Sequence, residues 1–146
     1  MAPAEFGAAI PTARPQALLV SPAIEDEVLL TQLFREQGWK LSTAKTLPAA
    51  RAFLRENTIP LAITEQDLPA GNWKDLMIEI QDLPRPPLLV VMSRLADERL
   101  WSEVLNFCGH DVLIKPLCQS EAVRIFNHAF HHWYSPRAMK RAAMGE

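Results

Sequence analysis

Apolar residues in this chain alternate between short continuous runs and longer stretches in which they recur at helical spacing. The first run covers residues 17–20. The stretch after it carries apolar residues at Ile24, Val28, Leu29, Leu33 and Phe34. Gly38 follows, and glycine is the residue that commonly ends a helix in a left-handed conformation. This part of the pattern predicts a strand followed by an amphipathic helix.

The same alternation continues to residue 133. It predicts strands at residues 39–44, 61–64, 88–92 and 111–114, and helices at residues 48–56, 73–80, 96–108 and 120–133. Residues 88–91 contain no polar position, as expected for a central strand covered on both faces. Right-handed crossovers between such strands leave few topologies other than an open parallel sheet. We therefore predict an α/β, flavodoxin-like three-layer sandwich with strand order 2-1-3-4-5 and five flanking helices.

The length of 146 residues fits a single domain. Residues 1–15 are rich in Ala and Pro and lack apolar periodicity, so we expect a disordered leader there, a folded domain at residues 16–134 and a flexible tail at residues 135–146. No apolar run approaches the roughly 20 residues of a membrane-spanning helix, and no signal-peptide pattern opens the chain. We expect a soluble, cytoplasmic protein.

The net charge of the chain limits the classes of partner that we expect it to bind. A formal net charge of -2 and a pI of about 6.1 provide no basic field, so neither nucleic acid nor an anionic membrane is an expected partner. Cys108 and Cys118 are the only cysteines and form no CxxC motif. We interpret them as reduced, packed thiols.

The predicted topology places a ligand site where the winding direction of the sheet reverses. In open parallel sheets, ligands bind beyond the carboxyl ends of the strands on either side of that point, here the first and third strands. This rule selects Ser21, Pro22 and Glu65, and the neighbouring strand ends add Ser93 and Lys115.

Three segments resemble the receiver domain of bacterial two-component response regulators. They are Ala-Leu-Leu-Val-Ser-Pro-Ala at residues 17–23, Pro-Leu-Ala-Ile-Thr-Glu-Gln-Asp-Leu-Pro at residues 60–69 and Asp-Val-Leu-Ile-Lys-Pro at residues 111–116. The resemblance covers about residues 16–133. It implies a non-enzymatic protein of two-component or phosphorelay signalling, a Lys115 that would contact an acyl phosphate, and a cis peptide bond before Pro116.

The chain departs from the receiver pattern at the reactive positions. Ser21 and Pro22 stand where the family has two acidic magnesium ligands, and a hydroxyl beside a proline is a poor substitute for two carboxylates. Glu65 stands at the phosphate-accepting aspartate, with an extra methylene that displaces its oxygens, although in-line transfer tolerates little displacement. The resemblance therefore implies a degenerate phosphorylation site with weak or absent magnesium binding and no other cofactor.

Two switch positions of the family are also identifiable by the resemblance. Ser93 keeps the hydroxyl of the switch Thr or Ser, whereas Val112 replaces the aromatic switch residue. Ser93 could respond to the charge at Glu65 or, as a hydroxyl shortly before a helix, could cap local backbone donors. Glu65 could mimic the activated state permanently or could simply pair with Lys115.

Other polar residues have competing interpretations. Asp67 is an alternative phosphoacceptor or a solvated loop residue. The acidic residues Glu25, Asp26 and Glu27 stabilise the dipole of the first helix, and we expect no metal there. His128, His131 and His132 could hold a transition metal or compensate the dipole of the last helix, and we favour the second because no carboxylate or cysteine is evident beside them.

The aromatic residues and the last two helices suggest where partners could bind. We interpret Trp39 and Trp133 as packing residues, whereas Trp73 is either a partner contact or locally packed. Members of the resembled family commonly associate through the face of the fourth helix, fifth strand and fifth helix. By position on that face, the candidate contacts are Arg99, Glu103 and Arg124.

We therefore expect a stand-alone degenerate receiver domain that acts through phosphorylation-independent association with a histidine kinase, another regulator or a second copy of itself, including a possible homodimer through that face. One alternative is residual phosphotransfer to Glu65 or Asp67. Another is a flavodoxin-like cofactor binder or small enzyme, but residues 21–27 contain no glycine for a phosphate cradle.

Overall fold

The computed structural model describes residues 14–95 and 97–135. The predicted leader up to residue 13 and the predicted tail from residue 136 lie outside the described residues. Between them the chain alternates strands and helices, as the apolar pattern predicted.

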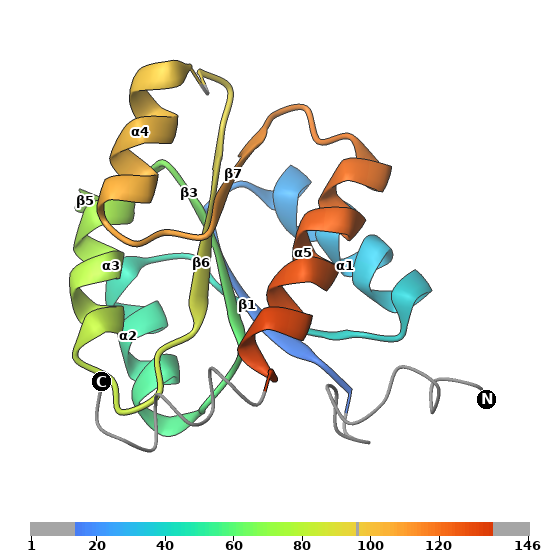
Figure 1. The fold of residues 1–146 in the computed structure, drawn as a ribbon, viewed down its shortest axis with the longest axis horizontal. Helices are drawn as coiled ribbons and strands as arrows, with labels where there is room; N and C mark the ends of the chain where they lie inside the picture. Colours follow the sequence, from blue (N-terminus) through green and yellow to red (C-terminus); the bar gives the residue numbers. More distant parts are fainter. Residues whose placement is uncertain (1–13, 96, 136–146) are drawn as a thin grey trace.

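Five parallel strands form the central sheet (Figure 1). They are β1 (Gln16–Val20), β2 (Lys40–Ala44), β3 (Leu61–Glu65), β6 (Leu88–Ser93) and β7 (Asp111–Ile114). Their spatial order is β2-β1-β3-β6-β7, so the predicted order 2-1-3-4-5 is confirmed. A short antiparallel pair, β4 (Asp67–Leu68) and β5 (Gly71–Asn72), follows β3 and was not predicted.

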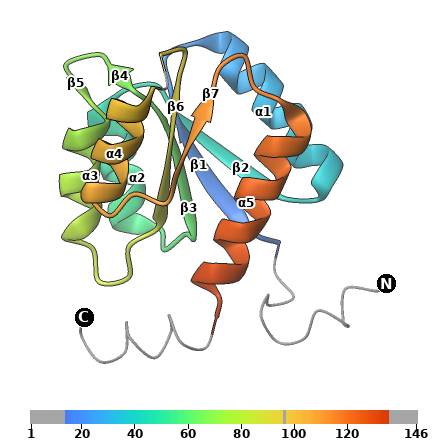
Figure 2. The same ribbon diagram turned by 45° about the horizontal axis from the view of Figure 1, so that its top comes forward.

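Helices cover both faces of the sheet. They are α1 (Ile24–Gln37), α2 (Leu47–Glu56), α3 (Trp73–Gln81), α4 (Glu98–Asn106) and α5 (Gln119–Trp133). α1 and α5 pack on one face, and α2, α3 and α4 pack on the other (Figures 1 and 2). Within residues 14–95 and 97–135, no helix is both long and apolar enough to cross a membrane.

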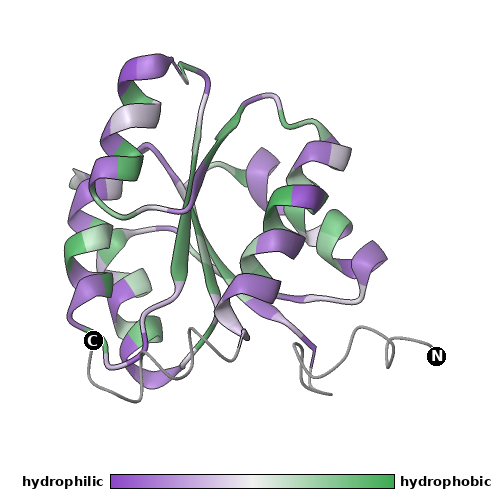
Figure 3. Cartoon of the chain, viewed as in Figure 1, coloured by the Kyte–Doolittle hydropathy of each residue, from purple (hydrophilic) through white to green (hydrophobic). Residues whose placement is uncertain are grey.

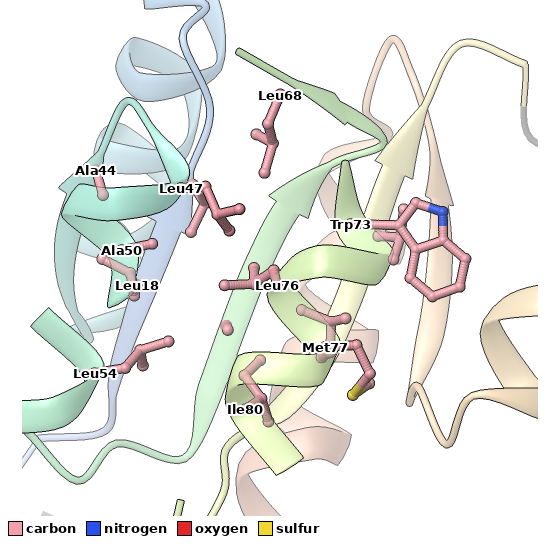
Figure 4. Packing of buried hydrophobic residues seen from close by; sticks show 14 of the residues in the cluster. Leu18, Ala44, Leu47, Ala50, Leu54, Leu68, Trp73, Leu76, Met77 and Ile80 are labelled. Carbon is pink, nitrogen blue, oxygen red and sulfur yellow. The ribbon is translucent and has the colours of Figure 1, made fainter. Parts of the chain in front are cut away.

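Side chains on the two faces of the central sheet belong to two separate hydrophobic cores. In β6, Val91 faces the α2, α3 and α4 side, whereas Val90 faces the α1 and α5 side. Apolar colouring in Figure 3 is accordingly concentrated on the strands and on the inner sides of the helices. In Figure 4, Leu47 of α2 and Leu76 and Ile80 of α3 point into the space between these helices and the sheet. This double coverage explains why β6 has no polar alternation.

Local signals account for most helix ends. Gly38 has φ 75° and its N–H donates to the Arg35 carbonyl, as predicted for the end of α1. Asn72 and Asp75 form a reciprocal capping box at the start of α3. The helix predicted at residues 96–108 is shorter, because Asp97 caps its start and Cys108 turns into a left-handed conformation with φ 67°.

The predicted inner face of α1 is partly wrong. Ile24 and Val28 are each 62% exposed and Leu29 is 43% exposed. The buried residues of α1 are instead Asp26, Leu30, Leu33 and Phe34. They follow helical spacing as closely as the predicted set does, but their first member is an acid. The helix is rotated so that Asp26 faces the carboxyl end of the sheet.

Substitution of two adjacent leucines tests this orientation of α1. Leu30 is fully buried and Leu29 is 43% exposed. We expect Leu30→Ala to lower the free energy of unfolding by about 2–5 kcal/mol because it leaves a cavity between α1 and the sheet. Leu29→Ala, the same truncation one residue away, should cost at most about 1 kcal/mol. Urea unfolding followed by circular dichroism measures both, and equal losses would contradict the observed orientation of α1.

Candidate functional site

The carboxyl ends of the parallel strands form one rim, as the topology required. Glu65 ends β3, Ser93 ends β6, Lys115 follows β7 and Ser21 follows β1. β3 pairs with both β1 and β6, and β6 also pairs with β7, so the four positions come from adjacent strands. The fold therefore brings the predicted site residues to a common edge.

Lys115 lies between two carboxylates at this rim. Its Nζ is 2.5 Å from Oε1 of Glu65 and 2.9 Å from Oδ1 of Asp26. The side chains of Lys115, Glu65 and Asp26 are 10%, 19% and 5% exposed. The first contact joins two positions that the resemblance selected. The second reaches back to the first turn of α1.

Asp26 is the site residue that sequence reasoning missed. We had assigned it with Glu25 and Glu27 to helix-dipole stabilisation, but it is 4% exposed and bonded to Lys115. Glu25 is exposed and Glu27 lies 3.7 Å from Lys45. A signal was present, because Asp26 is in phase with the buried Leu30 and Leu33.

Ser21 positions Asp26. The hydroxyl of Ser21 donates to Oδ2 of Asp26 at 2.8 Å and accepts from the backbone N–H of Ala23 at 3.1 Å. Ser21 is 6% exposed, whereas the neighbouring Pro22 is exposed. The serine therefore orients a carboxylate that comes from the helix.

Burial and neighbouring charges shift the pKa values of Glu65 and Lys115 within the triad that they form with Asp26. Burial raises the pKa of Glu65, with Asp26 adding to the rise and the hydrogen bond and charge of Lys115 opposing it. Burial also disfavours the charged form of Lys115, but its hydrogen bonds to Glu65 and Asp26 outweigh this and raise its pKa. The ammonium is thus the counter-ion of both acids.

Magnesium does not fit this arrangement. Mg²⁺ needs several hard oxygen ligands in near-octahedral geometry. Here the two carboxylates face an ammonium at 2.5 and 2.9 Å, and Ser21 donates its proton to one of them. Among residues 14–95 and 97–135, no three His, Cys, Asp or Glu side chains are arranged to hold a metal ion.

Ser93 is engaged locally. Its hydroxyl donates to Oε1 of Gln66 at 2.5 Å and accepts from the backbone N–H of Leu95 at 2.9 Å. This geometry corresponds to the capping alternative, with Gln66 as an added partner. Val112, at the other switch position, is buried beneath α4 in the core. The Lys115–Pro116 peptide bond is cis, the geometry that the resemblance implies.

Trp73 is a packed residue, so its interpretation as a partner contact is wrong. It is 2% exposed and its ring meets Phe107 edge to face at 5.8 Å between centroids. Its backbone N–H donates to the Gln66 carbonyl at 3.0 Å. Trp39 and Trp133 pack as predicted, Trp39 against Phe130 at 5.0 Å between ring centroids and Trp133 with 6% exposure.

Of the three predicted interaction residues, Arg124 lines a groove between α4 and α5, whereas Arg99 and Glu103 do not. Arg99 and Arg124 are exposed, whereas Glu103 is tied to Lys74 of α3 at 3.2 Å. The groove has a volume of about 370 Å³. It is lined by Trp101, Asp111, Val112, Ile114, Glu121, Arg124 and Ile125. Trp101 and Ile114, 49% and 55% exposed, were missed because apolar residues at helix and strand positions were assigned to the core.

The remaining candidates lie apart from the triad. Cys108 and Cys118 are both exposed, so the prediction that they are packed is wrong. Asp67 is exposed in β4. Nδ1 of His128 lies 3.3 Å from Nε2 of His110, a residue that the sequence analysis had not considered. Burial lowers the pKa of His110, as do the neighbouring His128 and His132, while Asp111 opposes the change.

No family model and no curated protein matches this chain. Solved structures do match it. The signal receiver domain of a Luxo repressor protein from Vibrio parahaemolyticus has a TM-score of 0.77 and 18% identity, over 92% of this chain and 99% of that one. That of an HD domain-containing protein from Pseudomonas fluorescens Pf-5 has a TM-score of 0.76 and 23% identity, over 84% and 98%. The beryllofluoride-activated NtrC4 receiver domain dimer has a TM-score of 0.74 and 19% identity, over 81% and 98%. The chain has the fold of response regulator receiver domains.

Removing the ammonium tests the triad. We expect Lys115→Met to lower the free energy of unfolding by about 3 kcal/mol near neutral pH, because it leaves two buried carboxylates without a counter-ion. Burial already raises the pKa of Glu65, and removing the cation that opposes this rise should raise it further, so protonation of Glu65 should shrink the deficit from about pH 7 to about pH 5.

Lys45→Met is the matched control. Lys45 and Glu27 form an exposed pair at 3.7 Å, so this loss should stay within about 0.5 kcal/mol. Urea unfolding across pH measures both variants. A Lys115→Met deficit that does not change with pH would show that the lysine stabilises by packing alone.

Proposed function

We propose that this receiver-fold protein works in two-component or phosphorelay signalling through phosphorylation-independent protein–protein interaction. One observation carries the proposal. The lysine that would attract a phosphoryl group is already held by Glu65 at 2.5 Å and Asp26 at 2.9 Å. The chain therefore supplies internally the negative charge that a phosphorylated receiver obtains from its modification.

The chemistry of phosphoryl transfer supports this proposal. Catalysis of that reaction rests on positioning and on a metal ion that neutralises the developing charge. At this rim the ammonium of Lys115 occupies the space between the two carboxylates, and Ser21 is committed to Asp26. Glu65 directs an oxygen at Lys115, so its attack on a phosphoryl donor would first have to break that ion pair.

Contacts around the rim hold the segment that leads to α4 in one arrangement. Ser93 bonds to the Gln66 side chain, and the Gln66 carbonyl accepts from the N–H of Trp73. Trp73 in turn packs on Phe107 at the end of α4. We infer that this chain of contacts presents a constant outer face at α4, independent of phosphorylation.

The partner that best fits this face is a second copy of the chain. Trp101 and Ile114 provide exposed apolar surface at the groove between α4 and α5. Glu121 and Arg124 border the same groove and carry opposite charges. A two-fold dimer needs one patch that complements itself, and a patch with both signs of charge around an apolar centre meets that need. NtrC4, which has the same fold, was solved as a receiver domain dimer.

Titration with a phosphoryl mimic tests phosphorylation independence. Trp73 is a suitable fluorescence reporter because it is buried and bonded to Gln66, the neighbour of Glu65. We expect no saturable change in tryptophan fluorescence when magnesium and then beryllofluoride are added. The variant Ser21→Asp/Pro22→Asp/Glu65→Asp restores the acidic pattern of the family and serves as the responsive control.

A saturable, magnesium-dependent change in the natural chain that disappears in Glu65→Ala would contradict the proposal. Backbone amide NMR spectra under the same conditions would detect binding that leaves the tryptophan fluorescence unchanged. A radiolabelled acyl-phosphate donor separates the two acceptors, since label that survives Glu65→Ala and disappears in Asp67→Ala would locate phosphotransfer at Asp67.

Sedimentation at increasing protein concentration tests the proposed self-association. We expect a monomer–dimer equilibrium that Ile114→Glu shifts to monomer, because a carboxylate would be buried at the apolar centre of the interface. Ile78→Glu is the matched control, since Ile78 is 57% exposed on α3, away from the groove. It should leave the equilibrium unchanged.

A chain that stays monomeric at all concentrations would rule out the dimer. Binding of a histidine kinase or another regulator that Ile114→Glu abolishes would then identify a different partner for the same face. Absence of both dimerisation and partner binding would contradict the proposed interaction function.

A further inference from the structure

A cluster of imidazoles lies at the end of β7 opposite Lys115. His110 immediately precedes β7, and His128 and His132 belong to the last turns of α5. Because α5 runs back along the sheet, its final turns lie beside the start of β7 (Figure 2). Nε2 of His110 and Nδ1 of His128 are 3.3 Å apart, and the His110 ring centroid is 5.2 Å from that of His128 and 6.2 Å from that of His132.

The distance between the His110 and His128 nitrogens matches that between two ligands of a metal centre. Zinc–imidazole bonds of about 2.0–2.1 Å in a tetrahedron place two ligand nitrogens about 3.3 Å apart. The His110 and His128 nitrogens already have this spacing. The same distance also suits a single shared proton, so a third ligand decides between the two interpretations.

The backbone holds His110 in a defined position. Its N–H donates to the Leu89 carbonyl at 2.7 Å, and the N–H of Gly109 donates to the Val104 carbonyl at 2.8 Å. A side chain at position 109 would clash with Cγ1 of Val104, so the loop closes tightly on α4. A ligand on such a fixed backbone loses little entropy on binding.

The two α5 histidines are presented by an equally well-anchored helix. Ala129 and Phe130, which lie between them in sequence, are fully buried. Residues four apart share one face of a helix, so His128 and His132 lie one turn apart on the same side. Both side chains are exposed and can rotate towards His110.

We propose that His110, His128 and His132 form a site for Zn²⁺ or another imidazole-preferring transition-metal ion, with water as the fourth ligand. In the described part of the chain no three such side chains already enclose a metal position. Two of the nitrogens, on His110 and His128, lie at the spacing of two ligands, and the exposed His132 would have to rotate to supply the third. The sequence interpretation against a metal rested on the lack of a further ligand beside α5, and the fold supplies His110 as that ligand.

Metal binding at this site would connect two elements of the interaction face. β7 and α5 both line the groove beside α4, and the proposed ligands bridge the start of one to the end of the other. A ligand that binds only the folded chain stabilises it by mass action. The inference does not depend on the degenerate site or on the proposed function.

Titration of the untagged full chain with zinc tests the proposal. Isothermal calorimetry and the rise in Tm are the measurements. We expect saturable binding of one Zn²⁺ per chain, weakened at least about tenfold by each of His110→Ala, His128→Ala and His132→Ala. His131→Ala, a neighbouring histidine of α5, is the matched control and should bind as the natural chain does. Co²⁺ substitution should show d–d bands without a thiolate charge-transfer band, which excludes Cys108 and Cys118 as ligands.

Two results would overturn it. No saturable binding would mean that His110 and His128 share a proton only. Binding that is unchanged in His110→Ala would mean that the helix histidines chelate without β7. Far-UV circular dichroism of each variant confirms that a lost affinity reflects a lost ligand in a folded chain.

Discussion

The contact of the Lys115 ammonium with Glu65 and Asp26 organises the carboxyl end of the sheet. It joins β7, β3 and α1, and removing the ammonium would leave two buried carboxylates without a counter-ion. Burial raises the pKa of Glu65, and the second acid of the cluster, Asp26, adds to this rise. Together these facts explain why Ser21 donates a hydrogen bond to Asp26, since that bond stabilises the carboxylate which Lys115 must share.

The orientation of α1 follows from the same contact. With Asp26 turned towards Lys115, Leu30, Leu33 and Phe34 complete the buried stripe, while Ile24 and Val28 remain 62% exposed. A polar requirement at the end of the sheet therefore determines which apolar residues of a helix reach the surface. The exposed apolar residues of α1 are a consequence of the site and need no partner of their own.

The two ends of β7 differ in character. Lys115, next to its carboxyl end, contacts the carboxylates of Glu65 and Asp26. His110, next to its start, lies near the imidazoles of His128 and His132 on α5. Between them Ile114 points outward into the groove beside Trp101. A single short strand thus connects the Lys115 site, the proposed dimer face and the proposed metal site.

The order of strands and helices and the strand-end positions of Glu65, Ser93 and Lys115 followed from the sequence, because apolar periodicity and parallel topology are encoded locally. The partners of those residues did not follow. Lys115 and Asp26 are separated by 89 positions, and His110 and His128 by 18. Periodicity allows several rotations of α1, and only tertiary contacts, with the Lys115–Asp26 pair among them, selected the one that buries an acid. The tertiary structure therefore decided which charges meet, because that depends on the relative rotation and register of elements that are distant in the chain.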